Sequence, residues 1–171
     1  MQKTTSPGTQ ENLIAEIWKV LEEVPDPEIP TISVVDLGIV TKVDVADGYK
    51  VDVTITPTFS GCPAINHMRD TVQARIQQLL PDFAVSVTVD FQTQWNTNLI
   101  TDKGREILKN FGLAPPKKYT GELSVDSIAN VNCPFCNSEN TTLNSPFGPT
   151  LCRSVHYCFD CLQGFEQFKP L

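Results

Sequence analysis

The stretch Pro57-Thr58-Phe59-Ser60-Gly61-Cys62-Pro63-Ala64 connects a predicted strand to a predicted helix. Before it, residues 51–56 alternate apolar and polar side chains, which is typical of a half-buried strand. After it, apolar residues recur at three- and four-residue steps along 65–79, as on one face of a helix. Pro63 suits the first helical position, because its missing N–H would be unpaired there in any case. The pattern predicts a strand-to-helix turn with Cys62 as the helix N-cap.

The position of Cys62 makes it a candidate functional thiol. A thiol at a helix N-terminus faces unpaired N–H donors and the positive end of the helix dipole, and both favour the thiolate. The thiolate is the form that attacks electrophiles and binds metals. A small buried cysteine that only closes the turn is the alternative, and the sequence leaves both interpretations open.

The composition indicates a globular protein: the chain has 171 residues, of which 40% are hydrophobic and 19% are charged. No apolar run is long enough to span a bilayer, and residues 1–8 lack the apolar core of a signal peptide. We therefore expect a cytoplasmic protein, whose six cysteines serve as metal ligands or reactive thiols rather than disulfides. The net charge of −7 argues against a nucleic-acid partner, because phosphate contacts need clustered lysine and arginine.

The elements around the Cys62 turn predict an α+β domain over residues 10–95. We expect a disordered tail at 1–9, followed by an apolar helical stripe from Leu13 to Val24 that stops before Pro25. The order helix, strand, strand, helix, strand predicts one small three-stranded sheet with two packed helices. The strands are expected at 39–45, 51–56 and 85–91, the first two joined by a hairpin turn at Asp47-Gly48.

The pattern weakens over residues 96–129. Thr101 is placed to cap a short helix that runs to Phe111, with Gly112 as its C-terminal stop. The proline-rich run from Ala114 to Lys118 then predicts a linker.

Two C-x-x-C pairs define a second domain over 130–171. Cys133 and Cys136 form the first pair, Cys158 and Cys161 the second, and this spacing is the signature of a zinc ribbon. A segment of this size, with few large apolar residues, cannot build a sufficient core alone, so bound metal is expected to supply its folding energy. We predict a small β-rich domain with structural Zn²⁺. A rubredoxin-like iron site uses the same ligands and remains open.

Three further residues have chemistry that the pairs do not use. Cys152 is an extra cysteine that would replace a ligand, remain a free thiol or pack, and Arg153 beside it would lower its pKa. His67 and His156 are the two histidines, and an ordinary surface or packing role is expected for each.

Several motifs of the first domain resemble a known family. Asp26-Pro27-Glu28-Ile29-Pro30, Asp36-Leu37-Gly38 and Thr58-x-Ser60-Gly61-Cys62-Pro63 resemble the MIP18 (DUF59) family of iron–sulfur assembly factors in order and spacing. With the five-cysteine tail, the chain beyond its first ten residues is similar to the D-subunit family of phenylacetyl-CoA epoxidase (ring-1,2-phenylacetyl-CoA monooxygenase) systems. Pro149 departs from that pattern, in which a small residue is expected.

The resemblance implies an accessory role in aerobic phenylacetate degradation, in the maturation or repair of an iron–sulfur or di-iron centre. The implied partners are other oxygenase subunits (the di-iron oxygenase or its iron–sulfur reductase) and iron–sulfur assembly proteins, and the assembly domain implies a homodimer. Cys62 would hold iron or a cluster transiently, near Asp26, Glu28 and Thr58. Nucleic acid and membrane are not expected partners.

The residues argue against direct catalysis. A di-iron carboxylate site uses Glu-x-x-His pairs, and the sequence has none. A reductase would need a dinucleotide-binding glycine motif, which is also missing. Two alternatives to the assembly role stay open: a non-catalytic structural or regulatory subunit that docks through the ribbon, and a thiol redox protein that uses Cys62 alone or with Cys152. The last is the weakest, because Cys62 has no C-x-x-C partner.

Overall fold

A computed structural model of the protein describes residues 7–47, 49–118 and 128–170. The chain divides into two compact units, Met1–Gln94 and Trp95–Leu171, each with its own sheet. Within the described ranges, every helix is too short or too polar to cross a membrane.

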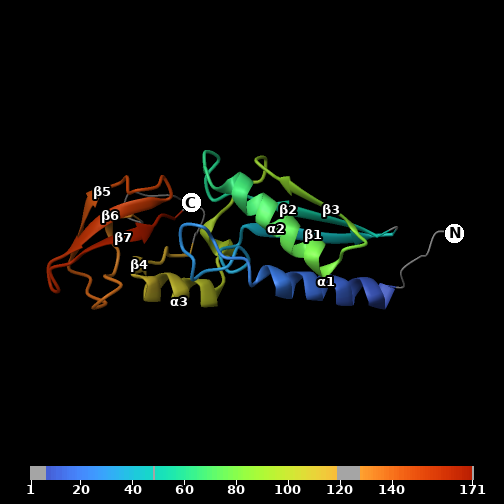
Figure 1. Cartoon of the computed structure of the whole chain (residues 1–171). Helices are drawn as coiled ribbons and strands as arrows, with labels where there is room; N and C mark the ends of the chain where they lie inside the picture. The colour runs from blue at the N-terminus through green and yellow to red at the C-terminus, as the bar shows by residue number, and fades with distance from the viewer. Residues whose placement is uncertain (1–6, 48, 119–127, 171) are drawn as a thin grey trace. The chain divides into compact units, whose positions relative to one another are not determined.

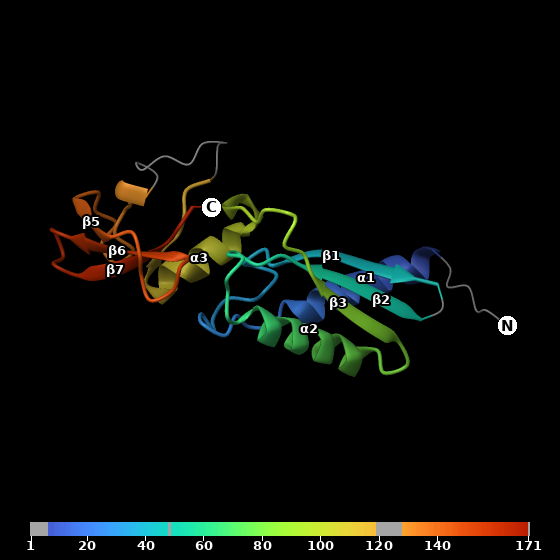
Figure 2. The same ribbon diagram turned by 90° about the horizontal axis from the view of Figure 1, so that it is seen from above.

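The first unit contains one three-stranded sheet and two helices (Figure 1), as predicted. The sheet order is β1-β2-β3, with β1 and β2 antiparallel and β2 and β3 parallel. Helix α2 makes the crossover between the two parallel strands, and α1 packs against both α2 and β1. Figure 2 shows the two helices running beside the strands. The element bounds are α1 Pro7–Leu21, β1 Val40–Ala46, β2 Lys50–Ile55, α2 Ile65–Leu79 and β3 Ala84–Val89.

The alternation in β2 places its apolar residues in the core. Val51, Val53 and Ile55 are at most 1% exposed, whereas the residues between them are half-buried. The apolar face of α2 packs onto this layer through four buried residues, Ile65, Met68, Val72 and Ile76. Each such side chain contributes roughly 1.5–3 kcal/mol by leaving water. The core therefore fixes the ends of β2 and α2, and with them the turn that carries Cys62.

The N-terminal helix differs from the prediction at both ends. It begins at Pro7, so the expected disordered tail is wrong for residues 7–9, and residues 1–6 lie outside the described part. The physical reason is that a proline at the first helical position has a backbone angle that already suits the helix. The helix ends at Leu21, and Val24 is buried in the turn that follows.

The second unit contains a four-stranded sheet of order β4-β7-β6-β5 and a helix, α3 (Figure 1). Strand β4 is parallel to β7, and the other neighbours are antiparallel. The bounds are η1 Thr97–Leu99, α3 Asp102–Phe111, β4 Leu113–Ala114, β5 Thr141–Ser145, β6 Arg153–Cys158 and β7 Gly164–Phe168.

The predicted caps of α3 are confirmed. The Thr101 hydroxyl accepts a hydrogen bond from the Gly104 N–H at 2.9 Å, and Gly112 ends the helix with a φ of 93°, which favours glycine. The predicted linker, however, begins inside a strand, because Ala114 pairs with Gln167 of β7. A two-residue strand is too short to show an alternating pattern, so β4 could not be predicted from its own residues.

Candidate functional site

The two cysteine pairs form two copies of the same turn. In the first, the Cys133 N–H donates to the Ser138 carbonyl at 2.9 Å; in the second, the Cys158 N–H donates to the Gln163 carbonyl at the same distance and spacing. The residue after the second cysteine of each turn has a left-handed backbone, with φ of 62° at Asn137 and 59° at Leu162. Each turn therefore curls back and brings its two thiols to one side.

The four thiols of these turns meet in one group. Their Sγ atoms all lie within 4.8 Å of one another. The Cys133–Cys161 and Cys136–Cys158 sulfur pairs are 3.6 Å apart, well beyond the roughly 2.05 Å of a disulfide. A tetrahedral metal with bonds of about 2.3 Å to sulfur separates its ligands by about 3.8 Å. The described residues contain only this one group of three or more His, Cys, Asp or Glu side chains able to share a metal ion.

The surroundings of the group suit metal binding. Cys133 and Cys158 are fully buried beside Val131 and Phe165, whereas Cys136 is exposed. Backbone N–H groups, first that of Cys161 and then that of Asp160, hydrogen-bond to the Cys158 sulfur and lower the pKa of Cys158 to about 7. Because metals bind thiolates, these donors favour the ligating form of Cys158, whereas burial raises the pKa of Cys161 to about 12.

A polar cross-link holds the two turns together. The Asp160 carboxylate, within the second pair, accepts hydrogen bonds from the Ser138 hydroxyl and from the Asn140 amide, the latter at 2.7 Å. These bonds, the Ser138 one foremost, lower the pKa of Asp160, so the carboxylate stays charged. Hydrogen bonds around a ligand group fix the orientation of the segments that carry the ligands.

Cys152 and His156 lie outside the ligand group. The Cys152 sulfur is 3.1 Å from the Thr150 hydroxyl oxygen. His156 is fully buried, stacks on Phe165 at 5.3 Å, and has its Nε2 atom 2.9 Å from the Ser154 hydroxyl. Burial lowers the pKa of His156 and favours the neutral ring. The expected packing role of His156 agrees with this environment, and His67 lies exposed on α2.

The Cys62 turn differs from the prediction in one respect. Helix α2 begins at Ile65, and its N-cap is Ala64, which has no side-chain cap bond. Cys62 is therefore not the N-cap: it lies two residues earlier and is half-buried. Its N–H donates to the Phe59 carbonyl at 3.0 Å, and its own carbonyl accepts from the Ile65 N–H at 3.4 Å. Pro63 thus falls in the turn and not in the helix, so the dipole argument for a thiolate loses force.

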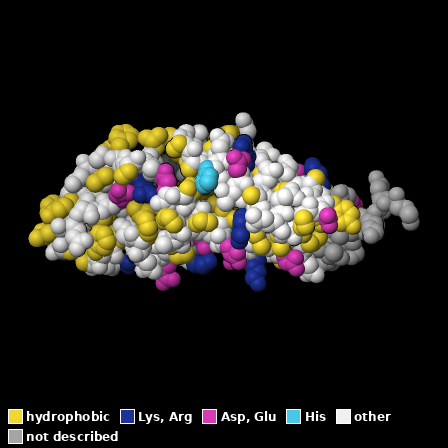
Figure 3. All heavy atoms as spheres, viewed as in Figure 1, with side chains coloured by type: hydrophobic (Ala, Val, Ile, Leu, Met, Phe, Trp, Pro, Cys, Tyr) yellow, Lys and Arg dark blue, Asp and Glu magenta, His cyan; other side chains and the backbone are white. Residues whose placement is uncertain are grey.

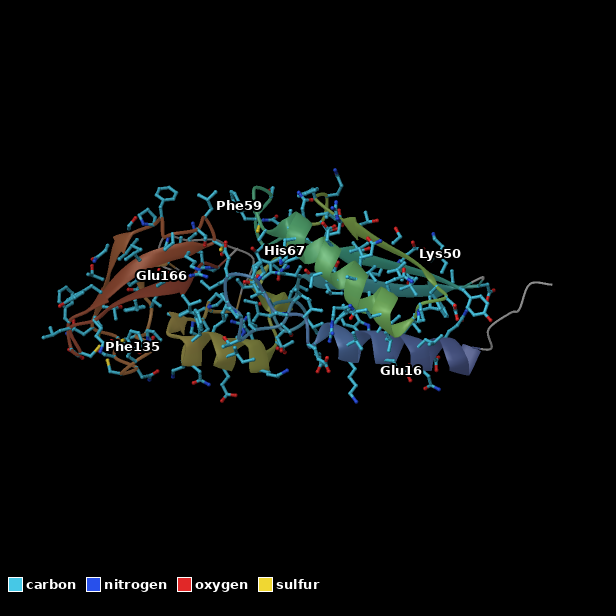
Figure 4. All side chains as sticks on the ribbon, viewed as in Figure 1. Glu16, Lys50, Phe59, His67, Phe135 and Glu166 are labelled. Atoms are coloured by element: carbon cyan, nitrogen blue, oxygen red, sulfur yellow. The ribbon has the colours of Figure 1, made fainter. Side chains whose placement is uncertain are left out.

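The surface next to the turn contains an exposed aromatic side chain. Figure 4 shows Phe59 and His67 at the N-terminal end of α2. Phe59 is 38% exposed. A Cβ atom added at Gly61 would lie 3.1 Å from the Phe59 ring, so a glycine leaves room for that ring over the turn. Thr58, the other candidate residue in this stretch, is half-buried.

The acidic loop has a structural role in addition to any chemistry. Asp26 is 7% exposed, and its Oδ1 atom accepts backbone hydrogen bonds from Glu28 and Ile29, both at 2.9 Å. This carboxylate therefore caps its own turn. The predicted closeness of Asp26 and Glu28 to Cys62 stays a prediction.

Sequence reasoning missed several residues around the cysteine group. The left-handed backbone of Leu162 could not be predicted from the sequence, because leucine rarely adopts a positive φ. Asp160, in contrast, is a carboxylate between two predicted ligands, and that position is a usable signal for a hydrogen bond beside the metal site. The buried hydrogen bond from Ser154 to Gln167, 3.2 Å long, joins β6 to β7 and could not be found without the strand register.

Two family models match the chain, one for each part. Residues 14–89 match "Iron-sulfur cluster assembly protein", and residues 119–169 match "PaaD zinc beta ribbon domain". The class is therefore a two-domain protein that joins an assembly-type domain to a zinc-ribbon-type domain. A protein of Escherichia coli (strain K12), named as the D subunit of "Putative 1,2-phenylacetyl-CoA epoxidase", is 35% identical over 91% of this chain and 92% of its own length. The chain belongs to the family of that protein, as the motifs predicted.

Two further matches cover a smaller share of the chain. The "Fe-S protein maturation auxiliary factor" of Porphyromonas gingivalis (strain ATCC BAA-308 / W83) is 35% identical over 52% of this chain and 83% of its own length. A crystal structure of a DUF59 domain from Bacillus anthracis covers 60% of this chain and 97% of its own, with a TM-score of 0.56 and 24% identity. This likeness confirms the predicted fold of the first domain.

Proposed function

We propose that this protein is a non-catalytic accessory factor that helps to mature or repair an iron–sulfur or di-iron centre of a phenylacetyl-CoA epoxidase system. The observation that carries the proposal is the match of residues 14–89 to the iron–sulfur cluster assembly family, since this range contains the Cys62 turn. The Escherichia coli relative, which matches 91% of this chain, is named as a subunit of such an epoxidase. The iron or cluster is cargo in this role.

Cys62 is the residue proposed to hold the cargo. It is not in a disulfide, is half-buried, and precedes α2 in a turn that backbone hydrogen bonds close. Asp26, Glu28 and Thr58 are proposed as neighbours. One thiolate with one or two carboxylates leaves coordination positions open on iron. We propose that the client protein or a second copy of the chain fills them, which suits a transfer intermediate.

The ribbon is proposed to bind structural zinc through Cys133, Cys136, Cys158 and Cys161. Their sulfur spacing fits a tetrahedral ion, and zinc prefers such closed four-thiolate sites. The ion would stabilise the fold of the second unit. The alternative is iron held by the same ligands, which metal analysis distinguishes.

The proposed partners are the di-iron oxygenase or the iron–sulfur reductase of the epoxidase system, together with iron–sulfur assembly proteins, in the cytoplasm. A homodimer is part of the proposal, because a second copy would complete the ligands around Cys62.

Anaerobic reconstitution tests the proposal. The purified chain and its Cys62→Ala variant are incubated with ferrous iron and sulfide, and the visible spectrum and the iron, sulfide and zinc contents are measured. We expect the wild type to bind a labile iron species and pass it to the metal-free reductase or oxygenase, and the variant to retain zinc only. Equal iron binding by both proteins would contradict the role of Cys62.

A non-catalytic structural subunit is the second candidate, and exposed apolar residues of the ribbon favour it. Figure 3 shows hydrophobic side chains at the surface of this part of the chain. In this case the variant Cys62→Ala would support normal metal loading of the oxygenase, and loss of the ribbon would abolish complex formation. Exposed residues suited to docking are Phe135, Phe147, Leu151, Phe159 and Leu162.

A further inference from the structure

A small pocket in the second unit lies next to the first cysteine turn. Its volume is about 130 Å³. This exceeds the roughly 10–15 Å³ that one water needs, and it is below the roughly 300–1,000 Å³ of pockets for drug-sized ligands. The walls come from the end of α3, the segment after β4, residues 130–134 and β7. Its size suits a ligand of a few heavy atoms.

The lining combines two lysines with one candidate metal ligand, Cys133. Among the residues that the structure describes, it contains Lys109 and Lys117 but no aspartate or glutamate, although the chain has 20 acidic residues against 13 basic ones. Three asparagines and one glutamine supply most of the other polar side chains. Two ammonium groups among amide side chains favour an anion, against the negative charge of the Cys133 thiolate.

Hydrogen bonds hold one of the two cations and one amide in place. The Asn137 Oδ1 atom accepts from the Lys109 ammonium at 3.2 Å. Because its amide oxygen is engaged, the Asn137 side chain presents its N–H groups to a further ligand. The same contact keeps the Lys109 charge at the rim. Gln167 is 1% exposed, and its Oε1 atom accepts a hydrogen bond from the Ser154 hydroxyl at 3.2 Å, which orients this side chain in the β7 wall.

We propose that this pocket binds a small oxyanion, a phosphate or a carboxylate, through the ammonium groups of Lys109 and Lys117 and the amide donors of Asn137. The site is separate from the Cys62 turn, so it does not depend on the proposed function. Charge-assisted hydrogen bonds from the lysines supply most of the affinity.

Nuclear magnetic resonance of the full zinc-loaded chain tests the pocket. Sodium phosphate, sodium acetate and sodium chloride are titrated at matched ionic strength, and backbone amide shifts of Asn132 and Gln167 are followed. We expect saturable shifts with phosphate or acetate and none with chloride, and the tighter of the two oxyanions identifies the ligand class. Absence of saturation with both oxyanions in the millimolar range would overturn the proposal.

Matched variants locate the binding. Lys109→Gln combined with Lys117→Gln should weaken binding at least about tenfold, whereas Lys103→Gln, an exposed lysine of α3 outside the lining, should not. Unchanged zinc content shows that each variant is folded. If the double variant does not fold, Lys117→Glu alone takes its place. Equal affinity in the lysine-pocket variants and the wild type would also overturn the proposal.

Discussion

At the residue scale, Cys62 is held by its neighbours' backbone. The turn is closed by the Cys62 N–H to Phe59 carbonyl bond, and α2 is stabilised by its four buried apolar residues. These backbone hydrogen bonds and the buried face of α2 hold the turn in place. If Cys62 only packs in the turn, its mutation should affect the oxygenase only by lowering the stability of this protein. If Cys62 delivers metal, its mutation should affect the oxygenase even when this protein stays folded.

We predict that Cys62→Ala lowers the free energy of unfolding by about 1 kcal/mol or less, against the roughly 5–15 kcal/mol of a typical domain. The oxygenase in cells that carry only this variant should be metal-poor and inactive. The measurements are a thermal melt of the variant and epoxidase activity per unit of soluble protein. Normal specific activity with normal metal loading would leave Cys62 without an assembly role.

Asp90 provides a pH-dependent contribution to the first unit. Hydrogen bonds from the Thr93 side chain, and then from the backbone N–H groups of Gln92 and Thr93, lower the pKa of Asp90. A carboxylate whose folded pKa is lowered stabilises the fold above its unfolded pKa of about 3.9, and the contribution disappears as the pH falls through the folded pKa. At pH 7 the Asp90→Ala variant should therefore have a lower melting temperature than the wild type.

Thermal melts between pH 7 and pH 3 check this prediction. The difference in melting temperature between wild type and Asp90→Ala should shrink below about pH 4. Asp82→Ala, a change of an exposed acid in the same unit, serves as the control. A difference that stays constant across the range would show that the carboxylate charge is not the cause.

At the element scale, each cysteine turn is built from local hydrogen bonds, and side-chain bonds link the two turns. The first turn lies between Val131 and β5, the second between β6 and β7, and Asp160 joins them. The ligand group therefore connects segments 22 or more residues apart in sequence. Loss of one ligand should release both turns.

We predict that Cys136→Ser removes the metal and unfolds the ribbon. Strand β4 pairs only with β7 within the described sheet, so it should lose its order as well. Zinc content and backbone amide spectra measure these effects, and the first unit should keep its native signals. Cys152→Ser is the matched control and should retain one zinc per chain. Full zinc content in Cys136→Ser would instead assign Cys152 as a ligand.

Helix α3 depends on its N-cap. Replacing Thr101 by alanine removes the acceptor for the Gly104 N–H and should cost about 1 kcal/mol. Thr101→Ser keeps the hydroxyl and should remain close to the wild type. Chemical denaturation of the zinc-loaded chain compares the three proteins. Equal stability of the alanine and serine variants would show that the cap bond does not matter in solution.

At the scale of the whole molecule, the two units differ in what stabilises them. The first has a core of buried valine, isoleucine and leucine. The second also buries large apolar residues, but the cluster around its ligand group contains Cys133 and Cys158 with Ala114, Val131 and Phe165. When a site of this kind forms only in the folded state, the free energy of metal binding stabilises the fold. The two units should therefore respond differently to metal removal.

We predict that a strong chelator abolishes the amide signals of the folded ribbon and leaves those of the first unit in place. Zinc added back should restore the ribbon, and magnesium should not, because thiolates bind it poorly. Persistence of a folded ribbon without bound metal would mean that its core is sufficient without the ion.

The sequence by itself determined the features that rest on local patterns. Each of these features is recognised from residues that are close together in the sequence. They are the alternating strands, the apolar face of α2, the Thr101 and Gly112 caps and the paired cysteines. The family motifs were also recognisable without a structure. These signals are local, so no tertiary information was needed to interpret them.

Only the tertiary structure decided the features that depend on packing between distant segments. The start of α2 at Ile65 and the pairing of Ala114 with β7 follow from contacts that no local pattern reveals. The position of Asp160 is a sequence signal, but its partners in the first turn are known only from the structure. The mistaken N-cap shows the reason: a proline suits both a turn and a first helical residue, and in the structure the helix begins two residues after Pro63. Packing energy across the core, which no single stretch carries, makes such choices.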